Sequence, residues 1–295
     1  MTPLERRYRL LLLAYPPAYR AAHGKELLGV LLDCAAPGRT TPEVRESAGL
    51  VTGGLRERVR HAARGSAWRD GLHLGATAVM AVQLAVLLPY AGSIPLWVVL
   101  SALALLAVLR GRVRIALPLA LLTGAKAVAI ASGRQLLDVT LLPVYPSFLT
   151  ARPMFVASSP ATVAVGYGLA CCCLLALAAR EAPPRTRSWW WWAAVPFAAW
   201  AGPAWMAEGT PFPISLSRMA LELAVLGLAV WAARLAGDPR WALAAALYLL
   251  VVSTQLGEHL AMLTPQHLAY WGLLVLLTAL AALVPYGGRR RVLLG

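Results

Sequence analysis

The segment LERRYRLLLLAYPPAYRAAHGKELLGVLLDC, residues 4–34, decides whether the fold begins with a signal peptide, a membrane span or a small soluble domain. A signal peptide needs an uninterrupted apolar stretch of about 7–15 residues, and a transmembrane helix needs about 20. The apolar run Leu10–Ala14 ends at once in Tyr15, Pro16 and Pro17. The segment therefore predicts neither a signal peptide nor a span.

Apolar residues in the first 60 positions recur at helical spacing on both sides of this proline break and again after Pro42. Thr40 and Glu43 have the spacing of a capping box, and Pro42 suits a first helical turn. Gly53 and Gly54 each cost roughly 1 kcal/mol relative to alanine inside a helix, which favours a close helix approach there. We expect a cytosolic three-helix domain over residues 1–68, with stripes of Leu4, Tyr8, Leu11, Leu12 and Tyr15; of Tyr19, His23, Leu27, Val30, Leu31 and Cys34; and of Val44, Ala48, Val51, Leu55 and Val59.

Long apolar runs dominate the chain after about residue 70 and account for most of its 59% hydrophobic content. Such runs are typical of transmembrane helices. Two of them are irregular, since 94–110 is short for a bilayer and 189–207 contains Pro196 and Pro203. The fold class is therefore all-α, with a polytopic domain over 69–295 whose eight expected transmembrane helices lie at 71–91, 94–110, 114–132, 158–179, 189–207, 214–236, 240–262 and 267–286.

The distribution of arginine gives the expected orientation. If the N-terminus is cytosolic, the outer connections hold only Arg134 and Arg152. The positive-inside rule then favours eight spans with both termini in the cytosol, and anionic lipid opposite the inner face accounts for the net charge of +14. Tryptophans Trp189–Trp192 fall at the same face, where an aromatic belt is expected. The inner connections hold Arg110, Arg112, Arg114, Arg180, Arg185, Arg187, Arg234, Arg240, Arg289, Arg290 and Arg291.

Several functional classes lack a sequence signature. No nucleophile elbow, phosphate-binding glycine loop, HExxH motif or carboxylate pair on one span is present, so we expect no enzyme activity and no catalytic residue. Cys171–Cys173 have no partner at zinc-site spacing, and His259 and His267 suit interfacial positions, so no metal or cofactor is expected. Basic and acidic residues are interspersed in the N-terminal part, which argues against direct nucleic-acid binding.

Four ionisable residues inside the expected spans are the candidate site. Lys126 lies about 18 Å from the inner side, and Glu222 about 12 Å from the outer side of a roughly 30 Å core. Their depths coincide, Arg218 lies one turn from Glu222, and Glu258 is at a similar level. We expect an intramembrane polar cluster of these four residues with a Lys126–Glu222 pair. It is either a structural ion pair or a site for a proton, an ion or a ligand.

The connection RQLLDVTLLPVYPSFLTARPMFV, residues 134–156, is apolar but interrupted by Pro143, Pro146 and Pro153. These prolines argue against a span. An interfacial helix or re-entrant lid that covers the polar cluster fits the pattern, and so does a plain loop on the membrane surface.

The opening segment also carries a motif. Tyr15-Pro16, Tyr19-Arg20, Gly24, Glu26 and Leu27-Leu28 resemble the permease-prefix type of N-terminal domain. This resemblance covers about residues 4–60. Such domains precede some macrolide-exporter-like permeases and occur on polytopic proteins of high-GC bacteria, often encoded beside PadR-like regulators. The resemblance implies a bacterial cytoplasmic membrane.

Two functions follow as hypotheses. In the first, the protein is regulatory or signalling: the prefix domain docks a cytosolic regulator while the lipid-embedded bundle senses a signal. In the second, it is a transporter or an ABC-permease component with an ATPase partner. Short inner connections, which offer no obvious coupling helix, favour the first.

Overall fold

A computed structural model describes residues 2–36, 38–138, 143–156, 158–180, 184–202 and 214–292, with side chains up to residue 286. The described residues are helical or irregular and contain no named strand. The chain divides into two compact units, Met1–Gly65 and Ser66–Gly295.

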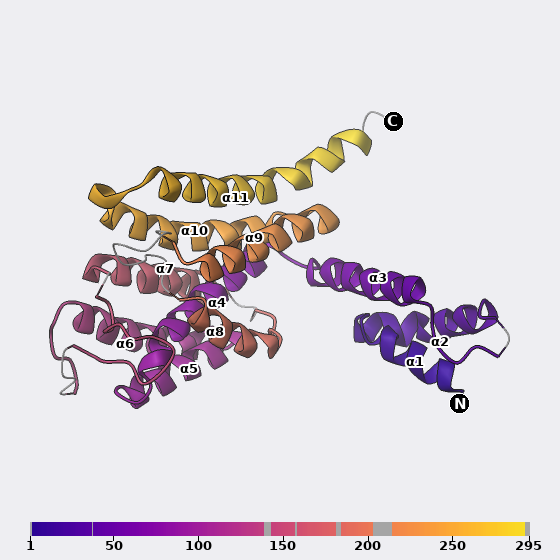
Figure 1. Cartoon of the computed structure of the whole chain (residues 1–295), viewed down its shortest axis with the longest axis horizontal. Coiled ribbons are helices and arrows are strands. Elements are labelled where there is room, and N and C mark those ends of the chain that lie inside the picture. The colour runs from indigo at the N-terminus through magenta and orange to yellow at the C-terminus, as the bar shows by residue number, and fades with distance from the viewer. Residues whose placement is uncertain are drawn as a thin grey trace. The chain divides into compact units, whose positions relative to one another are not determined.

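The first unit contains α1 (Pro3–Leu12), α2 (Pro17–Asp33) and α3 (Val44–Ala62) (Figure 1). The side chain of Thr2 caps α1 by accepting a hydrogen bond of 3.2 Å from the backbone N–H of Glu5. A proline at the first position begins α2, where the missing N–H costs no helical hydrogen bond.

The start of α3 differs from the expected capping box of Thr40 and Glu43. The N-cap is Glu43, and Glu46 accepts a hydrogen bond of 3.1 Å from its backbone N–H. The same Glu46 carboxylate accepts 2.9 Å from the hydroxyl of Tyr8 on α1. Pro42 disfavours helical backbone in Thr41, which would be the first helical residue if Thr40 were the N-cap.

Glycines form the face by which α3 packs against the turn between α1 and α2. A Cβ atom on Gly54 would lie 2.7 Å from Cβ of Ala14, and one on Gly53 would lie 2.6 Å from the hydroxyl of Tyr15. The close approach expected from the two glycines is confirmed.

The apolar stripe of α3 consequently points away from α1 and α2. Val44 is 87% exposed, Val51 38% and Leu55 46%. These three residues of the expected stripe are therefore largely exposed to solvent. The buried apolar side chains among the described residues of this unit are Leu4, Tyr8 and Leu12 of α1 and Pro16 of the turn before α2.

The second unit is a helical bundle in which α4 (Ala67–Leu87) lies between two groups of helices (Figure 1). Ala76, Met80 and Leu84 of α4 are almost fully buried in the main apolar cluster. On one side pack α5 (Pro95–Leu109), α6 (Val113–Ala131), α7 (Pro160–Ala178) and α8 (Trp190–Trp200). On the other are α9 (Leu216–Ala236), α10 (Arg240–Glu258) and α11 (Pro265–Val292), and short 3-10 turns follow α4 (Leu88–Tyr90) and α10 (Leu260–Met262).

Among the described residues, six helices are long and apolar enough to cross a membrane, which is the composition of a multi-pass membrane protein. Each of the eight expected spans contains a helix, but α5 has only 15 residues and α8 only 11. The last five residues of the expected span 189–207 lie outside the described part of the chain.

The connection between α6 and α7 contains no helix in its described residues, so an interfacial helix is not found there. It folds instead over the turn that follows α4. The N–H of Ser147 donates to Pro89 O over 2.7 Å, and the hydroxyl of Tyr90 donates to Arg152 O over 2.9 Å. The loop thereby covers one end of the bundle.

Candidate ligand cavity in the bundle

Arg218 and Glu222 form the centre of a buried polar network on α9. Nε of Arg218 donates to Glu222 over 2.7 Å. The hydroxyls of Tyr248 on α10 and Tyr270 on α11 each donate to the same carboxylate over 2.5 Å. A carboxylate is costly to bury unless it is paired and hydrogen-bonded, and three donors from three helices meet that requirement here.

The guanidinium of Arg218 is also held on its other side. Nη1 donates to Gly202 O and Nη2 to the hydroxyl of Tyr248, each over 3.3 Å. Within the described residues, each of the three guanidinium nitrogens of Arg218 thus donates one hydrogen bond. Both terminal nitrogens keep a second N–H.

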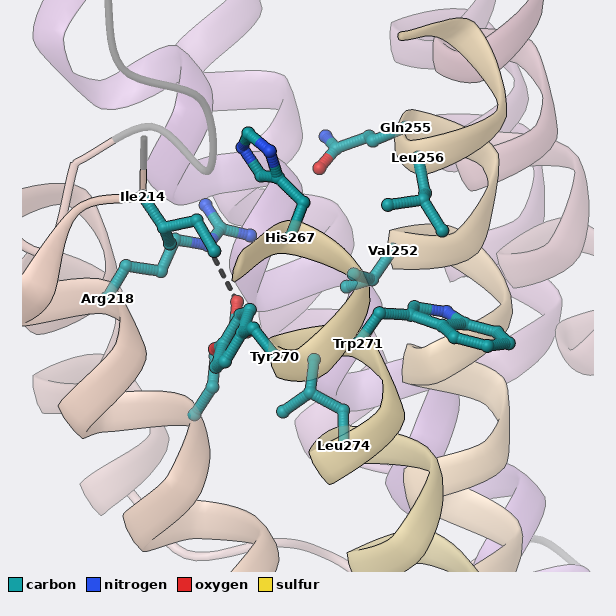
Figure 2. Close-up of a pocket in the computed structure, with 10 residues that line it drawn as sticks. Ile214, Arg218, Val252, Gln255, Leu256, His267, Tyr270, Trp271 and Leu274 are labelled. Carbon is teal, nitrogen blue, oxygen red and sulfur yellow. Dashed lines mark hydrogen bonds and ion pairs between the residues drawn. The ribbon is translucent and has the colours of Figure 1, made fainter. Parts of the chain in front are cut away.

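Two cavities adjoin this network. The larger, of about 240 Å³, is lined by α4, α8, α9, α10 and loop residues within 149–156 together with Ser158. The smaller, of about 30 Å³, lies between α9, α10 and α11, and Figure 2 shows Arg218, Gln255 and Tyr270 around it. Arg218, Glu222 and Gln255 line both cavities. The side-chain oxygen of Gln255 is buried and has no hydrogen-bond partner among the described residues.

The expected pair of Lys126 and Glu222 is not formed. Lys126 is buried and instead donates to Leu136 O over 2.9 Å and forms an ion pair with Asp138. Trp97 completes this second site: its Nε1 donates to Asp138 over 2.6 Å and its ring lies 5.4 Å from the ammonium. The loop after α6 turns back and brings the carboxylate of Asp138 to Lys126, so the lysine is paired without a carboxylate from another span.

Glu258 belongs to a third site. Its carboxylate accepts a hydrogen bond of 3.0 Å from the N–H of Ser159 and further bonds from the hydroxyls of Ser159 and Thr162. A carboxylate at this position satisfies free N–H groups at the start of α7 and interacts favourably with the helix dipole. Of the four expected cluster residues, only Arg218 and Glu222 therefore form one site.

The prefix-motif residues lie around the start of α2. The rings of Tyr15 and Tyr19 stack with their centroids 5.1 Å apart, and the ring centroids of Tyr19 and His23 are 4.9 Å apart. Pro16 precedes the helix, whereas Arg20, Gly24 and Glu26 lie within it. Glu26 is exposed, with its carboxylate 3.9 Å from His23.

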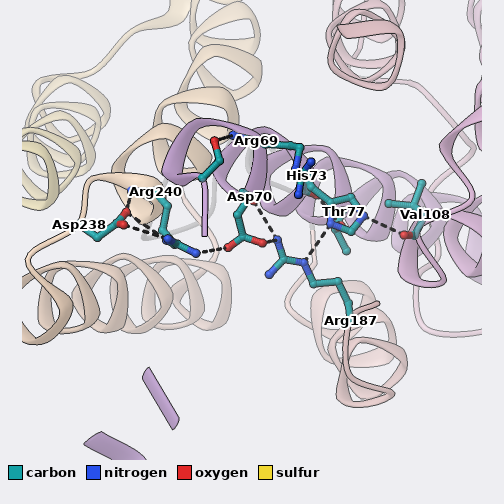
Figure 3. A network of polar contacts seen from close by, with 9 residues as sticks. Arg69, Asp70, His73, Thr77, Val108, Arg187, Asp238 and Arg240 are labelled. Atoms are coloured by element: carbon teal, nitrogen blue, oxygen red, sulfur yellow. Dashed lines mark hydrogen bonds and ion pairs between the residues drawn. The ribbon is translucent and has the colours of Figure 1, made fainter. Parts of the chain in front are cut away.

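A charged network at the opposite end of α4 was missed by the sequence analysis (Figure 3). Asp70 accepts hydrogen bonds from Arg187 over 2.6 Å and from Arg240 over 2.8 Å. Arg240 is only 1% exposed and also binds Asp238 over 2.9 Å. Two basic residues that the sequence assigned to loops are thus part of a buried network. Asp238, two residues before Arg240, was the only local signal in the sequence, since Arg187 and Asp70 are 117 residues apart.

His73 connects this network to α5. Its Nδ1 accepts a hydrogen bond of 3.2 Å from Nε of Arg187, and its Nε2 lies 2.8 Å from Val108 O. Because the guanidinium can only donate, the ring is neutral with its proton on Nε2, which donates to the carbonyl. Burial lowers the pKa of Arg187, and the charge of Asp70 opposes that shift.

Within the described residues, the four cysteines are free and no group of three or more histidine, cysteine or acidic side chains is arranged to hold a metal ion. His267 contacts the hydroxyl of Thr264 at 2.9 Å, and His259 contacts Gln255 O at 2.9 Å.

No family model matches the chain, and no curated protein or solved structure matches it either.

Proposed function

We propose that the protein regulates or signals at a bacterial cytoplasmic membrane by docking a cytosolic partner on its N-terminal unit, a domain of the permease-prefix type. The observation that carries this proposal is the exposed apolar stripe of α3. Val44, Val51 and Leu55 lie on one helical face because they are seven and four residues apart. Contiguous exposed apolar surface of this kind marks interaction sites.

The charged residues beside the stripe indicate which kind of partner would bind to it. Arg45 and Arg56 are exposed beside it, and the opposite face is occupied by the glycine contact with the α1–α2 turn. An amphipathic helix binds such a face with its own apolar residues, and acidic flanks complement the arginines. We therefore propose that the partner is a cytosolic regulatory protein that presents a helix of this kind.

The proposed topology has eight crossings with both termini in the cytosol. The arginine distribution supports it, because the outer connections carry only Arg134 and Arg152. A 15-residue helix such as α5 is about 22 Å long, shorter than the roughly 30 Å hydrocarbon core. Local thinning of the bilayer accommodates such a mismatch at modest cost.

The alternative function is a transporter or an ABC-permease component. The cavity of about 240 Å³ with Arg218 and Glu222 in its wall favours this alternative, because charged residues that face intramembrane cavities mark substrate or ion pathways. Flux into liposomes that contain the purified protein separates it from a purely regulatory role. Neither hypothesis involves catalysis, a cofactor or direct nucleic-acid binding.

Photo-crosslinking in cells tests the docking proposal. A benzoylphenylalanine at Val51 or Leu55 should crosslink to one regulatory protein, identified by mass spectrometry. The matched control is Arg60, an exposed position on the same helix that points away from the stripe. Equal crosslinking at all three positions, or none at Val51 and Leu55, would refute a docking role for the stripe. A crosslinked ATPase would favour the alternative.

A further inference from the structure

We infer that the turn between α5 and α6, residues 110–112, and the loop before α8, residues 184–189, together bind the phosphate of an anionic glycerophospholipid. The inference goes beyond the docking proposal, because it concerns the second unit of the chain and a lipid in place of a protein partner.

A close backbone contact joins the two segments. The N–H of Arg187 donates to Leu109 O over 2.7 Å. Gly111 has a φ of +72°, and a Cβ atom at this position would collide with Pro184 O. Glycine adopts such a φ without strain and leaves room for the carbonyl. The loop before α8 is thereby fixed against the end of α5.

Three exposed arginines surround this contact. Arg110 and Arg112 are the neighbours of Gly111, and Arg185 follows Pro184. Within the described residues, none of these three guanidinium groups forms an ion pair. The fold therefore brings three positive charges together at the surface of the bundle.

Acidic residues within the two connections cannot balance this charge. Glu181, which lies outside the described residues, is the one acid in the connections 110–114 and 180–188, and it can neutralise a single arginine. Asp70 of α4 pairs with Arg187, which is turned inward (Figure 3). The excess of positive charge attracts an anionic ligand. The arginines of the two connections are Arg110, Arg112, Arg114, Arg180, Arg185 and Arg187.

A tryptophan orients one of the three exposed arginines. The guanidinium of Arg110 lies over the ring of Trp189, 5.1 Å from its centroid. A guanidinium that stacks on an aromatic face keeps the N–H groups in its own plane available. Two parallel N–H donors match the oxygens of a phosphate. Arg110 is therefore held in a geometry that suits a bidentate phosphate contact.

The apolar surface beside the arginines favours a lipid over a soluble phosphate. Trp190 and Phe197 are exposed on α8, and they lie on one helical face because seven residues separate them. Trp190 begins the helix directly after Trp189. A lipid would place its phosphate at the arginines and an acyl chain along this face of α8.

Native mass spectrometry of the delipidated full-length protein in a neutral detergent tests the inference. The probes are phosphatidylglycerol and phosphatidylcholine with identical acyl chains, because choline cancels the charge of the phosphodiester. The first phosphatidylglycerol should bind at least about tenfold more tightly than phosphatidylcholine, since its phosphate has no internal counter-charge to compete with the arginines. Equal affinities would overturn the inference.

Two double variants locate the site. Arg110→Gln with Arg185→Gln should abolish the preference for phosphatidylglycerol, without a change in melting temperature, because both side chains are exposed. Arg60→Gln with Arg234→Gln is the control: it removes the same charge from exposed positions on α3 and α9 and should preserve the preference. Loss of the preference in both proteins, or in neither, would refute a site at the turn between α5 and α6.

A soluble phosphate ester is the competing occupant. Glycerol 3-phosphate carries the phosphate without acyl chains, and at millimolar concentration it should not displace phosphatidylglycerol. Displacement would overturn the assignment to a lipid. None of these outcomes depends on crosslinking at α3, so the docking proposal and the lipid proposal can fail separately.

Discussion

The ammonium of Lys126 on α6 forms an ion pair with Asp138, twelve residues later in the loop that follows the same helix. Trp97 of α5 binds the carboxylate from the other side through its indole N–H over 2.6 Å. A lysine buried among helices is thus neutralised by a loop, and the loop is fastened to the bundle by that pair.

Removing one member of this pair should destabilise the protein. Lys126→Met leaves Asp138, which is partly exposed and can be solvated, whereas Asp138→Asn leaves a buried ammonium. We expect Asp138→Asn to cost about 3 kcal/mol and Lys126→Met less, with the double variant recovering part of the loss. Melting temperatures in detergent measure these differences. Combining Lys126→Met with Glu222→Gln is the control, and its losses should add, since these residues have separate partners.

The Glu222 site should be more sensitive to loss of charge than to loss of a single hydroxyl. Glu222→Gln leaves Arg218 buried without a counter-charge, and we expect a loss of about 3–5 kcal/mol. Tyr270→Phe removes one of the three donors and should cost about 1–2 kcal/mol. Thermal unfolding in detergent should rank the two in this order. The reverse order would mean that the carboxylate is not the charge that stabilises Arg218.

The sequence predicts the helices of the bundle well because their causes are local. The expected span 114–132 corresponds to α6, and 214–236 to α9, since apolar runs and flanking polar residues determine where a long helix begins and ends. The contact at Gly54 was likewise signalled by two adjacent glycines inside a helical pattern.

The side-chain pairings could not be predicted in the same way, because they depend on tertiary contacts. Asp138 lies in a loop, whereas depth within the expected spans pairs Lys126 with Glu222. Arg240 finds Asp70 at a sequence separation of 170 residues. The outward direction of Val44 and Val51 follows from the glycine contact on the other face of α3, and an apolar stripe by itself does not say which side is covered.

The glycine contact gives a matched pair of substitutions. Gly54→Ala should destabilise the first unit, because its Cβ would lie 2.8 Å from the backbone carbon of Ala14, which cannot move aside as a side chain can. Gly49→Ala, on the same helix with no atom within 4 Å of its Cβ, should stabilise α3 by up to about 1 kcal/mol. Helical circular dichroism of a fragment of residues 1–65 measures both. A random-coil spectrum of the unmodified fragment would refute independent folding of the unit.

The first unit should lose stability in acid through Glu46. Hydrogen bonds from the N–H of Glu43 and the hydroxyl of Tyr8 lower the pKa of Glu46 from its ordinary value of 4.5. A lowered pKa in the folded state stabilises the fold above pH 4.5, and this contribution disappears as the pH falls through the lowered value. Tyr8→Phe removes one of the two donors and should reduce the difference between melting temperatures at pH 7 and pH 3. An identical difference in both proteins would show that Glu46 is not the group responsible.

The orientation in the membrane is tested by reporter fusions. Alkaline phosphatase is active only outside the cytosol, and green fluorescent protein fluoresces only when it folds inside. Fusions after Gly65, between Arg180 and Ser188, and after Gly295 should all fluoresce, because arginine-rich connections remain on the cytosolic side. A phosphatase inserted after Arg134 should be active, since the loop that covers the cavity is expected outside. If the fusion between Arg180 and Ser188 reports the outer side while that after Gly65 reports the inside, the number of crossings between them is odd, and a short helix such as α5 does not span the bilayer.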